Sequence, residues 1–406
     1  MPHAALDRPG FSVYVHVPFC ATRCGYCDFN TYTAAELGGG ASRAAYADTA
    51  LAEIRLARKM LGDTDLPVHT VFFGGGTPTL LSADDLGRLL RGIDAEFGLD
   101  ADVEVTTEAN PESVDPAYLA RLRDHGFTRI SLGMQSAQPH VLAVLDRRHT
   151  PGRPQHAVAE ARAAGFEHVS LDLIYGTPGE SDADWRASLD AALAAGPDHL
   201  SAYALTVETG TRLAALVRRG ELPAPDDDML ADRYLMADEV LGAAGLSWYE
   251  VSNWAASPDA RCRHNLAYWH SANWWGIGPG AHSHVDGTRW WNVRHPSTYA
   301  ARLADGASPA QAREELSPEG RRVESVMLGV RLREGLALDD LDDTGRAGVC
   351  GLVDGGLLDA TAYAAGRAVL TVRGRLLADA VVRVLLGWEG QSGLTSASKI
   401  VKTAHS

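Results

Sequence analysis

Three cysteines lie within eight residues near the start of the chain, in the stretch CATRCGYC. Cys20, Cys24 and Cys27 are four and then three positions apart, so three thiolates from one loop can converge on one metal centre. A structural zinc site normally takes a fourth protein ligand. Three thiolates alone leave one position open, which suits a [4Fe–4S] cluster whose fourth iron binds an exchangeable molecule. From the bare cysteines, both kinds of centre remain open.

Polar and Gly-rich residues at the ends of later apolar runs are further candidates for chemistry. In FFGGGTPT, three glycines allow backbone to come close to a ligand, although such a turn is more often only a turn. Glu108 ends the run VEVTTEA, where an acid is equally explained as a charge at a helix N-terminus. Asp172 lies within LDLIYG, and a buried acid on a strand is costly unless it is paired.

The elements that must position these residues are six short apolar, β-rich runs with helical segments between them. Helices are expected at 82–97, where Ser82 is a good N-cap, at 115–125 and at 226–244. Strands alternating with helices predict a parallel sheet, and six units are fewer than the eight of a closed barrel. The predicted fold is therefore α/β, a partial (β/α)6 TIM-like barrel. The six runs begin at Ser12, Thr70, Val103, Arg129, His168 and His199.

Four regions follow from this pattern. Residues 1–245 form the barrel core, and residues 246–305 form an aromatic- and Gly-rich segment expected to pack on the barrel. Residues 306–390 are expected to form a small helical or winged-helix-like domain that ends in β-like runs near 369–381. The polar residues 391–406 are expected to be a disordered tail.

Composition excludes several classes of function. The net charge of −15 argues against binding a nucleic-acid backbone, which needs a basic face. The N-terminus lacks the pattern of a signal peptide, and no apolar run is long enough to span a membrane. We expect a soluble cytoplasmic protein in which clustered cysteines bind metal, and in which Cys262 and Cys350 are isolated.

CATRCGYC resembles the C-x3-C-x-aromatic-C signature of the radical S-adenosylmethionine (radical SAM) superfamily, whose fold is also a six-unit part-barrel. The resemblance implies that Cys20, Cys24 and Cys27 hold a [4Fe–4S] cluster and that SAM binds its open iron. It also implies that the reduced cluster can cleave SAM to methionine and a 5′-deoxyadenosyl radical. Arg147 is expected on the helix after the fourth strand. The positions that the resemblance assigns to SAM contacts are Tyr14, Tyr26, Gly75, Gly76, Thr77, Glu108, Gln135, Arg147, Asp172 and Ala204.

Six longer stretches narrow the resemblance to the oxygen-independent coproporphyrinogen oxidase family: VHVPFC, GGGTPT, EANP, GMQS, DLIYG and HLSAYALTVE. One group in that family decarboxylates coproporphyrinogen, and the other, HemW, is a group of haem chaperones. The oxidases carry another cysteine where this chain has Phe29, and they carry an N-terminal extension that is not expected before Tyr14. HNLAYW resembles the H-N-x-x-Y-W motif associated with haem in HemW.

The resemblance therefore implies a haem chaperone that passes haem to an acceptor protein. Its haem residues are expected to be His264, Asn265, Tyr268 and Trp269, with His264 as the preferred iron ligand. A neutral imidazole can ligate haem iron, and aromatic rings give flat apolar surface to a porphyrin. The nearby alternative ligands are His270, His282, His284 and Cys262.

Other interpretations remain open at this stage. The aromatic segment is also explained as a core segment with hydrogen-bonded histidines, and the chain as a coproporphyrinogen oxidase or a zinc-stabilised interaction protein. The expected partners are haem, an unidentified haem acceptor and an electron donor such as flavodoxin or ferredoxin. Nucleic acid is not expected, and membrane association is expected only through an acceptor.

Overall fold

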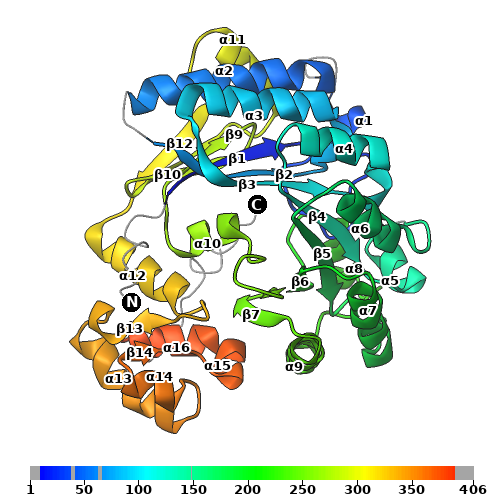
Figure 1. Ribbon diagram of the computed structural model, residues 1–406. Coiled ribbons are helices and arrows are strands. Elements are labelled where there is room, and N and C mark those ends of the chain that lie inside the picture. Colours follow the sequence, from blue (N-terminus) through cyan, green and yellow to red (C-terminus); the bar gives the residue numbers. More distant parts are fainter. Residues whose placement is uncertain (1–9, 38–41, 63–65, 148, 389–406) are drawn as a thin grey trace.

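A twelve-stranded sheet is the main element of the computed structural model, which describes residues 10–37, 42–62, 66–147 and 149–388 (Figure 1). Its central strands β1 to β6 lie side by side in chain order, and all five pairs are parallel. The predicted partial (β/α)6 barrel is thereby confirmed. These strands are β1 (Phe11–Val17), β2 (Val68–Gly75), β3 (Leu99–Ala109), β4 (Arg129–Gln135), β5 (His168–Tyr175) and β6 (His199–Ala204).

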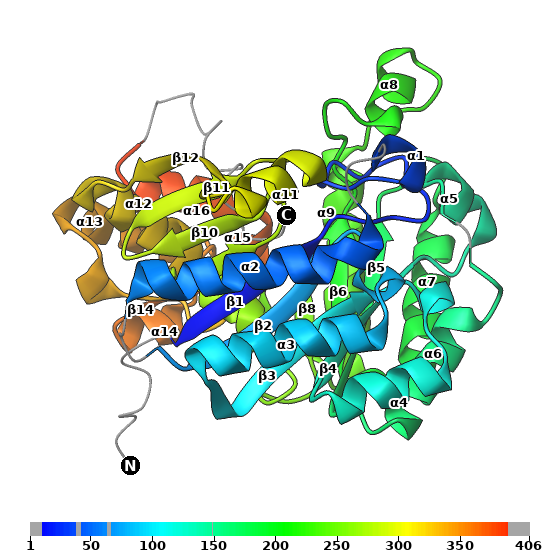
Figure 2. The ribbon, with the colours of Figure 1, turned by 90° about the horizontal axis from the view of Figure 1, so that it is seen from above.

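Helices cover the outer face of these strands (Figures 1 and 2). The predicted helices at 82–97, 115–125 and 226–244 are present, and Ser82 caps the first by accepting a hydrogen bond from the Asp85 N–H. Apolar side chains from both layers, such as Val15, Ile54 and Leu89, form one buried core. The helices are α2 (Arg43–Leu61), α3 (Ala83–Phe97), α4 (Pro116–Asp124), α6 (Arg153–Ala163), α7 (Asp182–Ala194) and α9 (Asp227–Ala243).

The aromatic segment extends the sheet at both of its edges, where sequence analysis expected it to pack on the barrel. Strands β8 (Asn253–Ala255) and β7 (Ser247–Glu250) continue from β6, antiparallel. Strand β9 (Trp274–Ile277) pairs in parallel with β1. These strands have only three or four residues, too few for a periodic signal. The edge beyond β9 is completed by antiparallel β10 (His282–Val285), β11 (Thr288–Asn292) and β12 (Ala310–Glu315).

Helix α10 (Arg263–Trp269) connects the two edges and carries the HNLAYW motif. It lies inside the curve of the sheet, whereas the helices named above lie outside it (Figure 1). This placement brings the motif into the interior of the barrel.

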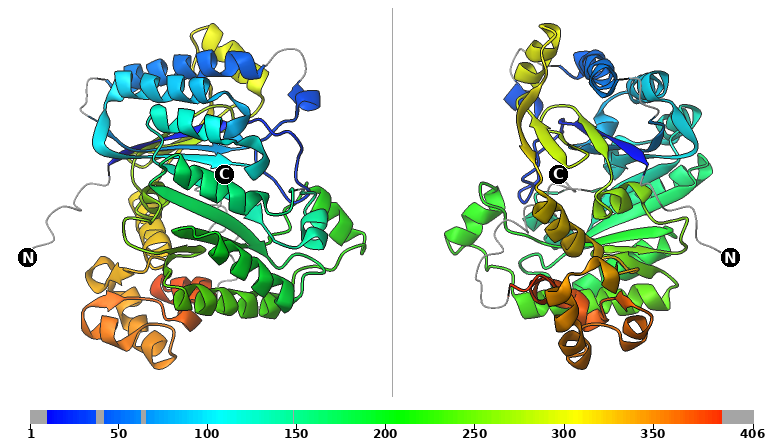
Figure 3. Two further views of the ribbon diagram at one scale, coloured as in Figure 1. Left: turned by 45° about the vertical axis from the view of Figure 1, so that its right-hand side comes forward. Right: turned by 90° about the vertical axis from the view of Figure 1, so that its left-hand side faces the viewer.

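The C-terminal unit is helical and has its own apolar core, which includes Val326, Val349 and Leu385 (Figure 3). The β-like runs expected near 369–381 were wrong, because this stretch forms α15 (Val372–Leu376) and the first half of α16 (Ala378–Leu385). Apolar runs this short do not distinguish a strand from a buried helix. The other elements are α12 (Pro318–Gly329), β13 (Leu336–Ala337), α13 (Asp343–Asp354), α14 (Ala360–Ala364) and β14 (Arg367–Ala368).

One arginine ties this unit to the barrel. Arg375 donates hydrogen bonds of 2.8 and 2.7 Å to Asp238 on α9, and its guanidinium lies 4.5 Å from the ring centre of Trp248. The expected tail at 391–406 lies outside the described residues. In the ranges that the structure describes, every helix is too short or too polar to cross a membrane.

Candidate functional site

A cavity of about 2020 Å³ brings the predicted site residues together inside the barrel. The cysteine loop, the Gly-rich turn, the acids of β3 and β5, and α10 all line it. Cys20, Cys24, Cys27 and all of the SAM-assigned positions named above line the cavity, as do His264, Asn265 and Tyr268. Trp269 is the exception, because it packs outside the cavity against Leu328 and Leu332.

Backbone hydrogen bonds hold the cysteine loop at the end of β1. The N–H of Cys20 donates to the carbonyl of Tyr32 at 3.0 Å, and the N–H of Tyr32 donates to that of Pro18 at 2.7 Å. Gly25 donates to the carbonyl of Leu145 at 3.1 Å. A Cβ at Gly25 would lie 2.4 Å from a carboxylate oxygen of Asp146, so a larger residue here would require that side chain to move. The loop is therefore fixed at its ends and its middle.

The three thiols fit a cluster better than a single ion. They are free and half-buried, and Arg147 Nη1 lies 3.7 Å from Cys24 Sγ, where a cation suits an anionic centre. Three thiolates on one zinc ion lie about 3.8 Å apart, from a zinc–sulfur distance of about 2.3 Å. In the described part of the chain, the three Sγ atoms do not all lie within 4.8 Å of one another. A [4Fe–4S] cluster is larger and holds its thiolates further apart.

The Gly-rich turn packs directly on the cysteine loop. Gly76 and Thr77 donate their N–H groups to the carbonyls of Val17 and Phe19, at 2.8 and 2.7 Å. A Cβ at Gly76 would lie 2.4 Å from the Phe19 oxygen, and Gly75 has a φ of 108°. The close approach at Gly76 is therefore to the cysteine loop of the chain itself. The contact of these residues with SAM stays a prediction.

Two acids lie in the cavity on neighbouring strands. Burial raises the pKa of Glu108 to about 8, and the Asp172 carboxyl acts in the same direction. Gly75 donates its N–H to Glu108 at 3.1 Å, which partly offsets this rise. Burial also raises the pKa of Asp172, whose two oxygens accept from Ser131 Oγ at 2.9 Å. The pairing expected for Asp172 is thus made by a hydroxyl.

The remaining SAM-assigned positions line the same cavity as these acids. Tyr14 contributes its hydroxyl to a hydrogen bond with His16 Nδ1 at 3.0 Å, and Gln135 has a φ of 65° at the end of β4. Tyr26 packs against a cluster of buried apolar residues, and Ala204 is the last residue of β6. Arg147 follows the short helix α5 (Pro139–Val144) and does not lie on it, which corrects the expectation. The loop lets its Nη2 reach the carbonyl of Gly133 at 2.9 Å.

A buried ion pair fixes the start of α10. Glu104 accepts the N–H groups of Arg263 and His264 at 3.1 and 3.0 Å, and accepts from Arg129 Nε at 3.1 Å. Burial favours the neutral acid, but Arg129 and these N–H groups outweigh it and lower the pKa of Glu104. Sequence analysis missed Glu104, although an acid on an apolar strand is the same signal that identified Asp172.

His264 has a partner at each ring nitrogen. Nδ1 is 2.7 Å from Thr70 Oγ1, and Nε2 is 2.9 Å from the hydroxyl of Tyr268. Its ring stacks on Phe72, with centroids 5.1 Å apart and planes 27° apart. Burial lowers the pKa of His264 to about 3, so the imidazole is neutral. Iron ligation by His264 would have to displace one of these partners.

The other proposed ligands are placed differently. His282 lines the cavity, and burial lowers its pKa to about 4, with Arg294 acting in the same direction. His270 is exposed at the end of α10. His284 Nδ1 is bonded to the carbonyl of Ala272 at 3.0 Å, outside the cavity lining. Cys262 is buried, and its thiol donates to Glu104 at 3.6 Å.

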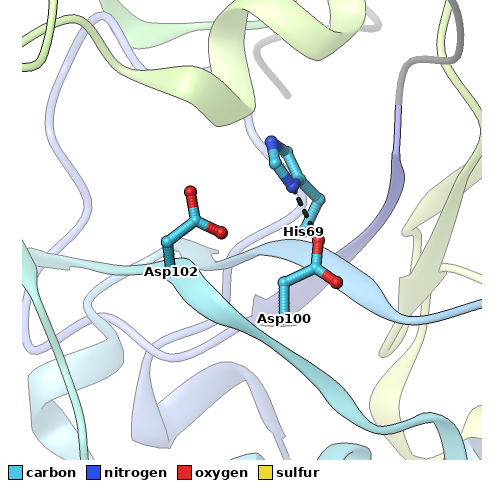
Figure 4. A group of neighbouring side chains, drawn as sticks. All are labelled: His69, Asp100 and Asp102. Atoms are coloured by element: carbon cyan, nitrogen blue, oxygen red, sulfur yellow. Dashed lines mark hydrogen bonds and ion pairs between the residues drawn. The ribbon is translucent and has the colours of Figure 1, made fainter. Parts of the chain in front are cut away.

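A histidine and two acids gather at the opposite end of β2 and β3 (Figure 4). His69 Nδ1 is 2.8 Å from Asp100, and Arg263 Nη1 donates to Asp102 at 3.0 Å. The guanidinium of Arg263 thus supplies positive charge to the group. Because Arg263 is the first residue of α10, this group anchors the motif helix to the sheet.

Comparisons with known proteins agree with this arrangement. Residues 14–192 match the family model described as the Radical SAM superfamily. Heme chaperone HemW of Mycobacterium tuberculosis is 57% identical over 385 residues, covering 95% of this chain and 97% of the relative. Heme chaperone HemW of Escherichia coli is 37% identical over 71% of this chain and 75% of the relative.

A solved structure confirms the fold. The chain is similar to coproporphyrinogen III oxidase (HemN) from Escherichia coli, with a TM-score of 0.78 and 21% identity. The match covers 94% of this chain and 91% of the other. At this identity the likeness concerns architecture alone.

Proposed function

We propose that this chain, which belongs to the HemW family of the radical SAM superfamily, is a haem chaperone that passes haem to an acceptor protein in the cytoplasm. One observation carries the proposal. The cysteine loop and the HNLAYW helix, 237 residues apart at Cys27 and His264, line a single cavity. Haem bound there would lie beside the cluster and SAM.

The residues present fit a [4Fe–4S] cluster with bound SAM. Cys20, Cys24 and Cys27 would hold the cluster, and the open iron would take SAM. A cluster with SAM supplies one-electron chemistry to the cavity when both are bound. Arg147 places positive charge beside Cys24 and bridges it to the strand end at Gly133. An electron donor such as flavodoxin or ferredoxin would then be a partner.

The acids are arranged to receive the polar end of SAM. Glu108 orients the Gly75 N–H, and Asp172 is held by Ser131, so two oxygen-rich groups face the same space. A carboxyl can accept hydrogen bonds from an amino group or a ribose. Tyr14, Tyr26, Gln135 and Ala204 would complete this contact surface.

Haem would occupy the part of the cavity next to α10. His264, Asn265 and Tyr268 line it, whereas Trp269 supports the helix from the outside. The cavity of about 2020 Å³ has room for both a porphyrin and SAM. Haem is the cargo in this proposal, and the unidentified acceptor is its destination.

Anaerobic haem titration tests the function. Protein with reconstituted cluster should bind haem and then release it to apomyoglobin, used as a generic acceptor and followed by its absorbance. Absence of haem binding would overturn the proposal. Conversion of coproporphyrinogen to protoporphyrinogen, with SAM and a reductant, would favour the oxidase interpretation instead.

A further inference from the structure

The histidines that line the cavity differ in whether their nitrogens are already used. His16 is bonded to the Tyr14 hydroxyl and to the Asn30 carbonyl, both at 3.0 Å. His199 is bonded to Ser170 at 2.6 Å and to Tyr249 at 2.8 Å, and His264 is likewise bonded at both nitrogens. His149, the other histidine of the lining, accepts from Arg147 Nε at 3.4 Å through its Nε2. Of these histidines, His282 alone makes no hydrogen bond with the described residues at either ring nitrogen.

The backbone around His282 is fixed although its imidazole nitrogens are free. Its carbonyl accepts from Trp274 Nε1 at 3.0 Å, and its strand β10 pairs with β11. Trp291 lies directly opposite on β11, and the two rings stack with centroids 5.8 Å apart and planes 25° apart. Both side chains line the cavity. His282 is therefore a positioned ring with available lone pairs.

A guanidinium stands beside this pair. The carbonyl of Arg294 is held by Asn30 Nδ2 at 2.8 Å and by the Tyr32 hydroxyl at 3.3 Å, so the residue is anchored to the end of the cysteine loop. Arg294 also lines the cavity as an exposed residue, and it forms no ion pair or hydrogen bond with the described residues. A carboxylate pairs well with such a free guanidinium.

We propose that His282 is an axial ligand of haem iron in this cavity, with Trp291 supplying apolar surface and Arg294 pairing with a haem propionate. An imidazole with a free nitrogen can bind iron without first breaking a hydrogen bond. Aromatic rings and arginine suit the apolar and anionic parts of haem, respectively. The proposal rests on the proposed function and specifies the ligand that sequence analysis had assigned to His264.

Three alanine variants test the ligand: His282→Ala, His264→Ala and the exposed control His270→Ala. Each is titrated anaerobically with hemin, followed by its visible absorbance and its electron paramagnetic resonance spectrum. His282→Ala should bind haem at least about tenfold more weakly and lose the imidazole-ligated spectrum, which added imidazole should restore. His270→Ala should match the wild type. Circular dichroism and iron content check that each variant is folded and carries its cluster.

The outcomes separate the two proposals. Unchanged affinity and spectrum in His282→Ala, with loss in His264→Ala, would overturn the His282 assignment and leave the chaperone function standing. Loss in both variants would support His282 as one of two ligands. Unchanged haem binding in both would place haem outside this cavity, and would overturn both the ligand and the proposed site.

A second pair of variants tests the propionate contact. Arg294→Met should weaken hemin binding about three- to tenfold, and Arg294→Lys should recover part of that loss. With haem dimethyl ester, which lacks the carboxylates, the wild type and Arg294→Met should bind equally. A persistent difference with the ester would contradict pairing through a propionate.

Discussion

The cysteine loop and helix α10 line the same cavity, but they are held in opposite ways. The loop is fixed through its backbone, at Cys20, Gly25 and Tyr32, and its thiols stay half-exposed. Helix α10 is fixed through side chains, because Glu104 binds its first N–H groups and His264 is bonded at both nitrogens. The loop presents reactive groups, whereas the helix has most of its polar groups already satisfied.

This difference shows that a residue in a sequence motif need not have an atom available to bind a cofactor. Residues that must receive a cofactor keep their donor atoms available, and residues that build a wall use theirs internally. By this criterion HNLAYW forms a wall of the cavity, whereas His282, eighteen residues after His264, keeps both of its ring nitrogens available. Four experiments test the contrast between the two regions.

The largest effect is expected from the loop. Cys24→Ala should abolish the cluster, because two thiolates do not replace three, and iron and acid-labile sulfide should fall to near zero after anaerobic reconstitution. The matched control is Cys350→Ala, which removes an exposed cysteine of the C-terminal unit and should keep the full content. Zinc without sulfide in the wild type would contradict the cluster assignment.

Loss of the residue that anchors α10 should instead lower the free energy of unfolding. Glu104→Ala leaves Arg129 as an unpaired buried charge and two N–H groups of α10 without an acceptor, which costs about 3–5 kcal/mol of unfolding free energy. Denaturant unfolding of cluster-free protein measures this. Glu319→Ala, which breaks an exposed pair with Arg322, should cost less than about 1 kcal/mol. Similar losses in the two variants would show that the buried pair does not anchor α10.

The cavity acid between the two regions should give a pH dependence. The folded-state pKa of Glu108 is raised to about 8 from an ordinary 4.5, so the folded state binds this proton more tightly than the unfolded state. Stability from this group is therefore present below pH 4.5 and is lost as the pH rises through 8. Glu108→Gln should be more stable than the wild type at pH 8.5, by an amount on the order of a few kcal/mol.

Unfolding of cluster-free, SAM-free protein at pH 5.5, 7 and 8.5 measures this dependence. The difference between variant and wild type should grow with pH. A constant difference at all three values would show that the Glu108 carboxyl ionises normally in the folded state.

The smallest effect is expected where the glycine turn meets the cysteine loop. Gly76→Ala places a Cβ against the Phe19 carbonyl and should cost about 1–3 kcal/mol. Gly242→Ala, in α9 with open space around it, should be neutral or stabilising by about 0.5–1 kcal/mol. Equal stability of the two variants, measured by thermal unfolding, would show that the loop tolerates displacement.

Sequence reasoning succeeded where a local signal was strong. The six barrel strands are apolar runs of six or more residues, and the spacing of Cys20, Cys24 and Cys27 is itself local. Features that depend on distant partners could not be placed from the sequence. The motif assigns Trp269 to haem, which stays a prediction, but the direction of its side chain follows from where α10 meets α12.

The four histidines between 264 and 284 look alike in the sequence. Which of them has hydrogen-bonded ring nitrogens depends on the pairing of β10 with β11 and on the positions of Thr70 and Tyr268. The same is true of the C-terminal stretch at 369–381, where burial against a helical core overrode its strand-like composition. Long-range contacts therefore carried the information that the local patterns lacked.

The pairing of β1 with β9 has a consequence for how the chain folds as it is synthesised. Ser12 pairs with Trp274, so one edge of the almost fully buried strand β1 stays unpaired until a segment more than 250 residues later has been synthesised. Until β9 leaves the ribosome, β1 is an unpaired apolar edge, which is prone to aggregate. The cysteine loop that follows β1 is likewise exposed during this interval. Completion of the sheet and enclosure of the cofactor chamber are thus one late folding event, whose rate is limited by sequence separation.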